Sequence, residues 1–313
     1  FGMFSVFIPG NFVQIVYSSS GAVIFSFYIV YDTQLIIETI QQNFENLFLI
    51  NNKYNLGAGK SFEVGVKYFL NSGGDYLVKI DGDDQFSEQD VVFLNQHIKK
   101  EHFDFIKCDR FWHQGIVGEI PAIRYFGNSF ASLLIKFSTG CWAINDPLNG
   151  LFVFSKEMLD NFKIPRLFHR YGYPFYVVTN SLNKSIINNF KIGQFKNEVK
   201  YANEASYLNP FIMFFKLIWY TMQNYYTKIF LKIKISDFQI SALIDILSQS
   251  LIVLSFYSIY KAVIIRYFSS VGPQGNWFLA SLLFIFSAIF LINLSQKIES
   301  KITKNRIENI NIY

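Results

Sequence analysis

The first two thirds of the chain alternate short apolar runs with segments whose apolar residues recur at helical spacing. The apolar runs predict strands at residues 5–8, 27–30, 47–50, 76–81 and 103–106. Helical spacing predicts a helix at residues 35–44 and two more, one after Gly59 and one after Ser87. Phe62, Val66 and Phe69 share one face of the second helix, and Val91, Leu94 and Ile98 share one face of the third. Repeated βα units predict an α/β fold in which a mostly parallel sheet carries helices on both faces.

Two longer apolar segments follow, at residues 240–265 and 277–294. Crossing a bilayer takes about 20 residues, and the connector at residues 269–276 is short, polar and rich in turn residues. The pattern predicts a transmembrane helical hairpin. The alternative is a pair of buried core helices, which Asp245 and Gln249 in the first segment favour.

The stretch from Pro210 to Lys234 mixes aromatic and basic residues, as helices in a membrane interface do. A third span is the competing interpretation, which Lys216 disfavours. We therefore divide the chain into an α/β domain at residues 1–209, interfacial or juxtamembrane helices at 210–238, the hairpin at 239–296 and a basic cytoplasmic tail at 297–313.

Composition agrees with a globular domain attached to a membrane. Of the 313 residues 51% are hydrophobic, and the mean hydropathy of +0.23 is too apolar for an ordinary soluble enzyme. The net charge of +5 is modest. Its cations do not form an aromatic-interleaved stripe, so no nucleic-acid partner is expected.

The cations instead flank the outer ends of the hairpin: Lys228, Lys232, Lys234, Lys297, Lys301, Lys304 and Arg306. Near the connector stand Lys261 and Arg266. The positive-inside rule then places both ends and the α/β domain in the cytoplasm, in a multi-pass protein of the inner or plasma membrane. No secretory signal is visible. Cys108 and Cys141 lack metal-ligand spacing and need not form a disulfide, so they fit a reducing compartment.

The candidate chemistry begins with an acidic run at the end of the strand at residues 76–81. Asp81, Asp83 and Gln85 bring oxygen ligands together where open α/β sheets hold their ligands. Such oxygens suit Mg²⁺ or Mn²⁺ bridging a diphosphate, although an acidic surface turn has the same composition. Alternation along an extended chain turns Asp84 away from Asp83. Asp32 ends another predicted strand at the same edge.

The sequence Gly57-Ala58-Gly59-Lys60-Ser61 contains the GKS of a P-loop. The full pattern also needs a glycine where Tyr54 stands, and a P-loop follows a first strand. We therefore exclude a P-loop NTPase.

Several further motifs follow in order. They are V-F-I-P at residues 6–9, the acid Asp32, N-x-G-x-G at 55–59, D-x-D-x-Q at 81–85, C-D-R-F at 108–111, P-x-x-R-x-x-G-N at 121–128, D-x-x-x-G at 146–150 and Y-A-N-E-A-S-x-x-N-P at 201–210. Together with the hairpin they make the chain resemble family 2 glycosyltransferases of the Rossmann-like GT-A fold. The resemblance is to the polyprenyl-phosphate branch, as in dolichol-phosphate mannosyltransferase and bacterial undecaprenyl-phosphate glucosyltransferases.

The resemblance implies metal-assisted, inverting transfer of a hexose from UDP-glucose, GDP-mannose or a similar donor to a polyprenyl phosphate. It assigns nucleotide-sugar binding to Pro9, Asp32, Asn55, Gly57, Gly59, Asp81 and Asp83. It assigns the metal to Asp81, Asp83 and Gln85, and the acceptor phosphate to Arg110, Arg124, Lys200 and Ser206. The catalytic candidates are Asp83, Asp146 and Arg124.

A phosphate monoester is already mostly a dianion at neutral pH, so it needs positioning more than it needs a general base. We therefore expect Asp146 to orient a group, although a base role stays open.

The chain departs from the family pattern at Gly10-Asn11-Phe12-Val13, where the family has Y-N-E-E, and at Ala202 and Ala205. A catalytically impaired, membrane-anchored pseudoenzyme or assembly subunit of a cell-surface glycan pathway is therefore the alternative. The membrane is an expected partner in either case, and association into a homo-oligomer is left open.

Overall fold

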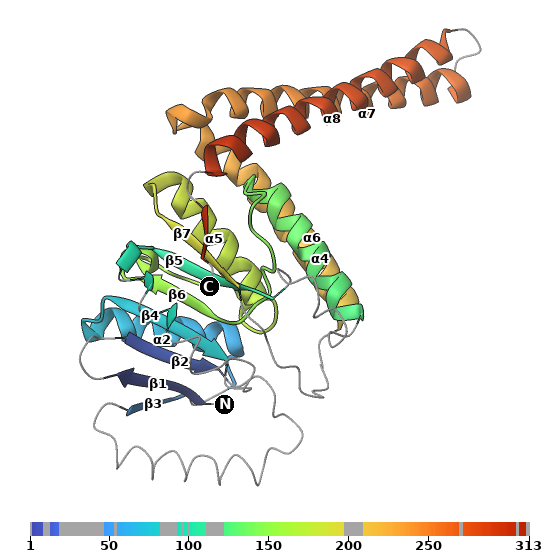
Figure 1. The fold of residues 1–313 in the computed structure, drawn as a ribbon. Helices are drawn as coiled ribbons and strands as arrows, with labels where there is room; N and C mark the ends of the chain where they lie inside the picture. Colours follow the sequence, from blue (N-terminus) through green and yellow to red (C-terminus); the bar gives the residue numbers. More distant parts are fainter. Residues whose placement is uncertain are drawn as a thin grey trace.

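The computed structural model describes residues 2–8, 13–18, 47–52, 55–81, 93–94, 97–98, 100–110, 122–196, 209–268, 272–304 and 307–310. Within these residues one sheet of eight strands carries the fold, in the order β3-β1-β2-β4-β6-β5-β7-β8. The strands are β1 (Gly2–Ile8), β2 (Val13–Ser18), β3 (Leu47–Asn51), β4 (Tyr76–Asp81), β5 (Phe105–Asp109), β6 (Phe152–Ser155), β7 (Ile192–Lys196) and β8 (Ile307–Ile310). The helices are α2 (Ala58–Ser72), α4 (Ala122–Thr139), α5 (Tyr173–Asn188), α6 (Pro210–Ile233), α7 (Gln239–Phe268) and α8 (Gln274–Lys304) (Figure 1).

The α/β architecture is confirmed, but the expectation of a mostly parallel sheet is wrong. β1 runs antiparallel to β2 and β3, and β6 runs antiparallel to β4 and β5. The parallel pairs are β2–β4, β5–β7 and β7–β8. Four residues separate Ile8 from Val13, which are paired across β1 and β2, whereas a parallel pair needs a crossover of about a dozen residues or more. The sheet is therefore mixed.

The strands expected at residues 5–8, 47–50 and 76–81 are confirmed as β1, β3 and β4, and the helix after Gly59 as α2. The strand expected at 103–106 is present as β5, but it begins two residues later and runs on to Asp109. β2 was not foreseen. The elements expected at residues 27–30 and 35–44, and the helix start at Ser87, lie outside the described residues.

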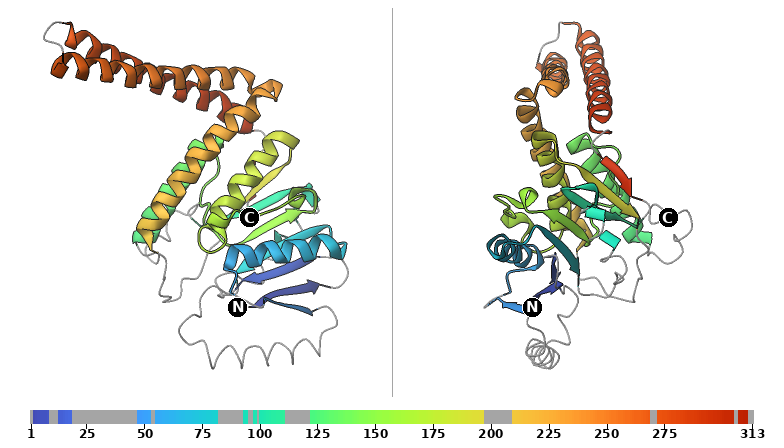
Figure 2. Two further views of the ribbon diagram at one scale, coloured as in Figure 1. Left: turned by 180° about the vertical axis from the view of Figure 1, so that it is seen from behind. Right: turned by 60° about the vertical axis from the view of Figure 1, so that its left-hand side comes forward.

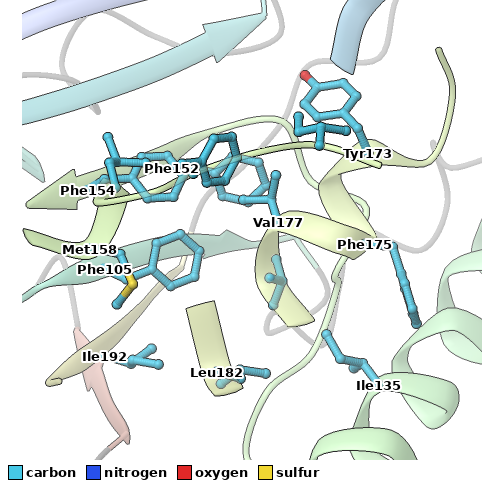
Figure 3. Close-up of a cluster of buried hydrophobic side chains, with 14 of the residues drawn as sticks. Phe105, Ile135, Phe152, Phe154, Met158, Tyr173, Phe175, Val177, Leu182 and Ile192 are labelled. Atoms are coloured by element: carbon cyan, nitrogen blue, oxygen red, sulfur yellow. The ribbon is translucent and has the colours of Figure 1, made fainter. Parts of the chain in front are cut away.

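The two faces of the sheet hold separate cores. On one face Phe62 of α2 packs with the strand residues Phe105, Phe152 and Phe154. Figure 3 shows these strand residues together with Met158 and with Val177 of α5. On the other face lie Val78, Leu94, Ile98, Phe103, Ile106, Val153 and Phe195. Leu77 and Val78 face opposite cores because successive side chains alternate across a strand.

α4 and α6 lie side by side and run in the same direction (Figures 1 and 2). The Phe130 and Phe214 rings stack with centroids 4.8 Å apart, and those of Phe137 and Tyr225 stack at 5.0 Å. The side chain of Asn209 caps α6 by accepting hydrogen bonds from the backbone N–H groups of Phe211 and Ile212. α6 thus joins the sheet domain to the segment that follows.

α7 and α8 form a helical hairpin that projects from the sheet domain (Figures 1 and 2). Among the described residues two helices are long and apolar enough to cross a membrane, Ser236–Phe268 and Gln274–Lys304; α6 is not one of them. Leu283 is 68% exposed and Phe286 66%. The structure therefore does not bury this pair of helices in a core.

Small residues spaced seven apart fill the seam of the hairpin. They are Ser241, Ser248 and Ser255 in α7, and Ser281, Ala288 and Ser295 in α8. The Ser255 hydroxyl lies 2.9 Å from that of Ser281, and the Ser295 hydroxyl donates to the carbonyl of Ser241 at 3.2 Å. Opposite chain directions bring the two series into register, and small residues let the helix backbones approach closely.

The chain returns to the sheet after the hairpin. β8 adds to the edge by pairing in parallel with β7, from Ile192 opposite Ile307 to Phe195 opposite Ile310. This strand was not foreseen. Both ends of the hairpin are consequently tied to the same domain, through α6 at its start and β8 at its end.

Candidate functional site

The candidate site lies at the edge of the sheet where β4 and β5 end. β6 lies between these strands and runs against both, so the residues before it cross their carboxyl ends. We call residues 140–151 the site loop. It connects α4 to β6 and contains the predicted acceptor motif at residues 146–150.

Arg110 and Asp146 form a bidentate ion pair across the site loop. The Arg110 Nε donates to Asp146 Oδ2 at 2.7 Å, and its second guanidinium nitrogen donates to Oδ1 at 2.7 Å. The backbone N–H of Arg110 also donates to Oδ2, at 3.1 Å. Asp146 is fully buried. Arg110 and Asp146, two site residues predicted separately from the sequence, are 36 positions apart along the chain and in contact in the fold.

The backbone of Asp146 is held in the left-handed region, with φ 47°. Its N–H donates to the Ser132 hydroxyl at 3.0 Å, and that hydroxyl donates to the carbonyl of Asn128 at 2.8 Å. Asn149 donates to Asp146 Oδ2 at 3.3 Å. Such a conformation persists only where surrounding contacts fix it. Here Ser132 of α4 holds the backbone, and Asn149 contacts the side chain.

The electrostatics of the site disfavour a base role for Asp146. Burial alone would raise the pKa of its carboxyl group, but Arg110, followed by Lys107, holds that pKa below its ordinary value. A carboxylate with a lowered pKa and a bidentate arginine partner is a weak proton acceptor. It can, however, fix the guanidinium of Arg110 in one orientation.

Two buried lysines, which the sequence patterns did not single out, hold the site loop. Lys79 donates to the carbonyl of Gly150 at 2.7 Å. Lys107 donates to the carbonyls of Cys108, at 2.7 Å, and of Asn145. Burial lowers the pKa of Lys107, although the nearby negative charges of Asp146 and Asp109 act to raise it. A signal was present: residues 78–81 read V-K-I-D and residues 106–109 read I-K-C-D, each at the end of a buried strand.

Asn145 ties the loop to three further elements. Its side chain accepts from Lys136 at 2.8 Å and donates to Asp109 at 3.3 Å, while its backbone N–H donates to Gln194 at 2.9 Å. α4, β5 and β7 therefore all position the residue directly before Asp146.

The predicted N-x-G-x-G turn precedes α2. The side chain of Asn55 accepts from the backbone N–H of Gly57 at 3.0 Å. Gly57 has φ +82°, and a Cβ there would lie 2.6 Å from the carbonyl oxygen of His169; a Cβ on Gly59 would collide with the carbonyl of Phe168. The close approach of the segment around residue 169 thus explains both glycines.

Tyr173 links this turn to the site loop. A Cβ on Gly59 would lie 2.8 Å from the Tyr173 Cβ, and Lys79 Nζ lies 5.2 Å from the centroid of the Tyr173 ring. Since Lys79 also holds Gly150, the turn and the loop belong to one connected region.

The remaining predicted site residues are not placed as side chains. Pro9, Asp32, Asp83, Gln85, Lys200 and Ser206 lie outside the described residues, and only the backbones of Asp81 and Arg124 are described, in β4 and α4. No group of three His, Cys, Asp or Glu side chains that could hold a metal occurs within the described parts of the chain. Asp81 does end β4, in register with Ser18 of β2. The carboxylate and amide oxygens of Asp81, Asp83 and Gln85 are the donors that Mg²⁺ or Mn²⁺ accepts.

Residues 31–162 match the model of the glycosyl transferase family 2. The matched span runs from before β3 to after β6, so it includes Asp81, Arg110, Asp146 and the site loop. This domain supports a role in glycosyl transfer. A comparison with curated proteins gives no significant match.

Proposed function

We propose that the protein is a membrane-anchored glycosyltransferase that moves a hexose from a nucleotide-sugar to a polyprenyl phosphate, with inversion at the anomeric carbon. The observation that carries this proposal is the buried Arg110–Asp146 pair within the family 2 domain, next to a hairpin whose outer surface is apolar. The family match supports glycosyl transfer; the acceptor and the anchor are inferred from the loop and the hairpin.

In the proposed reaction an oxygen of the acceptor phosphate attacks the anomeric carbon, and the bond to the nucleoside diphosphate breaks. The phosphate is already mostly a dianion, so the protein has to position it and compensate its charge. We assign that task to Arg110, Arg124, Lys200 and Ser206. Asp146 keeps the Arg110 guanidinium in place through its two oxygens.

On the donor side, Pro9, Asp32, Asn55, Gly57 and Gly59 would line the nucleotide pocket, with Asp81 and Asp83 toward the diphosphate. Asp81, Asp83 and Gln85 would hold Mg²⁺ or Mn²⁺, and the ion would supply positive charge to stabilise the leaving diphosphate.

The proposed membrane placement rests on exposed apolar residues. Large side chains cover the outer surfaces of α7 and α8, and α6 adds Phe211, Phe215, Trp219 and Phe230 to the exposed set. α6 meets the hairpin at an angle (Figure 1), as a helix in the interface would meet helices that cross the bilayer.

The proposed cytoplasmic orientation rests on fewer cations than the sequence suggests. Lys228 and Lys232 are buried in ion pairs with Glu299 and, for Lys232, also with Asp245. The cations that support a cytoplasmic orientation are therefore the exposed Lys234, Lys297, Lys301 and Lys304.

A panel of labelled nucleotide-sugars, assayed with undecaprenyl phosphate in isolated membranes, tests the proposal. We expect transfer from one donor, loss of most transfer in Asp83→Ala, and near-normal transfer in the matched control Asp84→Ala. Unchanged transfer in Asp83→Ala would contradict the catalytic assignment.

The alternative is a pseudoenzyme or assembly subunit, which the altered segment at residues 10–13 motivates. Metal-dependent binding of UDP-glucose or GDP-mannose to the purified protein would exclude an inert subunit.

A further inference from the structure

The base of the hairpin contacts the site loop directly. Trp142 Nε1 donates to Gln296 Oε1 of α8 at 3.1 Å, and Gln296 Nε2 donates to the carbonyl of Phe137 at 3.0 Å. Gly140 has φ +75°, and a Cβ at this position would collide with the carboxylate of Glu299. α8 therefore packs against the end of α4 and the start of the site loop.

The other end of the same loop forms the candidate site. Asn145, three residues beyond Trp142, is held by Lys136, Gln194 and Asp109. Asp146 follows with its bidentate contact to Arg110. Trp142 and Asp146, which both have side-chain or backbone contacts to other elements, are therefore only four residues apart along the chain.

The hairpin base is itself fixed by a buried charge cluster, which consists of Lys228, Lys232, Asp245 and Glu299. Lys228 donates to Glu299 at 2.7 Å, Lys232 bridges Asp245 and Glu299, and the Tyr225 hydroxyl donates to Asp245 at 3.2 Å. All four charged residues are buried. Three helices, α6, α7 and α8, meet in this cluster.

Anchoring alone does not require such a cluster, because an apolar hairpin of this length is enough to hold a protein in a bilayer. Buried ion pairs contribute little net stability compared with apolar packing, but removing one partner is costly, so they hold one arrangement. The cluster is thus suited to fix the direction in which the hairpin leaves the domain.

We propose that the hairpin is a working part of the site as well as an anchor. Gln296 acts as a positioning residue, and with Glu299 it holds the site loop so that Asp146 can orient Arg110 toward the acceptor phosphate. The effect on catalysis rests on the proposed function. That α8 holds the site loop in place does not depend on it.

The test uses the full chain in detergent with a short-chain, water-soluble polyprenyl phosphate, so that anchoring cannot limit the rate. Gln296→Leu removes both hydrogen bonds at similar volume. Asn293→Leu, one turn away on the exposed side of α8, is the matched control. We expect kcat to fall roughly tenfold in Gln296→Leu with the KM for the nucleotide-sugar unchanged, and no change in the control.

Hydrogen exchange of the site loop provides the second readout. The backbone N–H groups of Asn145, Asp146 and Leu151 donate to the side chains of Gln194, Ser132 and Asn149, respectively. We expect them to exchange roughly tenfold faster in Gln296→Leu. Trp142→Phe is the second variant, for use if Gln296→Leu does not fold. It removes the indole donor without changing α8, so we expect the same effects on exchange and kcat, but smaller ones.

The two readouts separate the inference from the proposed function. If the wild-type protein transfers no sugar, the proposed function fails, and hydrogen exchange alone decides whether the hairpin holds the loop. If transfer occurs but both exchange and kcat are unchanged in Gln296→Leu and Trp142→Phe, the inference is wrong and the proposed function stands. Faster exchange of the site loop with an unchanged kcat also overturns the inference, because the hairpin would then hold the loop without affecting catalysis.

Discussion

In the sheet domain large side chains fill the interior, whereas in the hairpin they face outward. Phe62 and Phe154 are fully buried between sheet and helices, while Leu283 and Phe290 are 68% and 67% exposed on α8. Serines occupy the interior of the hairpin, and charged groups its base. This inverted arrangement supports the proposed membrane anchor. The first region packs as a domain in water does, whereas the second suits hydrocarbon, where small residues rather than large ones bring helices together.

The largest expected effect concerns the charge cluster at the hairpin base. Lys232→Met leaves Asp245 and Glu299 without the cation that bridges them, and removing one partner of a buried ion pair costs about 3–5 kcal/mol. Chemical unfolding in detergent measures this loss. Lys234→Met changes an exposed lysine at the end of α6 and should cost less than about 0.5 kcal/mol. Equal losses in the two variants would mean that the cluster does not hold the hairpin.

The second prediction tests the solvent of the hairpin directly. Leu283→Arg places a charge on an exposed position of α8, which in a bilayer costs about 3 kcal/mol of insertion free energy. Membrane flotation should show less inserted protein. Ile187→Arg, at an exposed position of α5, should insert normally. If Leu283→Arg also inserts normally, a surrounding bilayer does not explain why large apolar side chains face outward in the hairpin.

The third prediction concerns the ion pair at the edge of the sheet. Asp146→Asn leaves Arg110 without its counter-charge, so we expect a loss of about 2–3 kcal/mol at neutral pH. Because the pKa of Asp146 is below its ordinary value in the folded state, its contribution is fully present above about pH 4 and is lost as the pH falls through the lowered pKa. Unfolding free energies of wild type and variant should therefore differ by a constant amount from pH 7 to pH 5 and converge at lower pH. A difference that grows on acidification would contradict the assigned direction.

The smallest expected effect concerns the seam of the hairpin. Ser248→Leu overfills a buried position between α7 and α8 and should destabilise the hairpin by about 1–3 kcal/mol. Ser250→Leu makes the same change on the exposed side of α7, where an apolar surrounding accepts it. Thermal unfolding in detergent compares the two. Similar melting temperatures would show that the seam is loosely packed.

Local patterns predicted those parts of the fold that depend on neighbours in the sequence. The face shared by Phe62, Val66 and Phe69 predicted α2, and uninterrupted apolar length predicted α7 and α8. The seven-residue spacing of Ser241, Ser248 and Ser255 could have predicted the hairpin seam as well.

Other features depend on contacts that the sequence does not display. Strand direction follows from the path of each connection, and the site loop returns the chain so that β6 runs against β4 and β5. A lysine within a strand is ordinarily exposed. Lys79 is buried because the carbonyl of Gly150, 71 residues away, accepts its hydrogen bond. The partners Arg110 and Asp146 were both named, but their pairing emerged only from the fold.

The return of the chain to β7 has a consequence for synthesis. A ribosome completes α7 and α8 before it adds β8, so until then β7 presents an unpaired edge. Such edges pair readily with other chains. We expect a nascent chain whose hairpin is delayed in reaching the membrane to expose this edge for longer and to aggregate through it. The edge of β7 is thus covered only after both helices of the hairpin have been made.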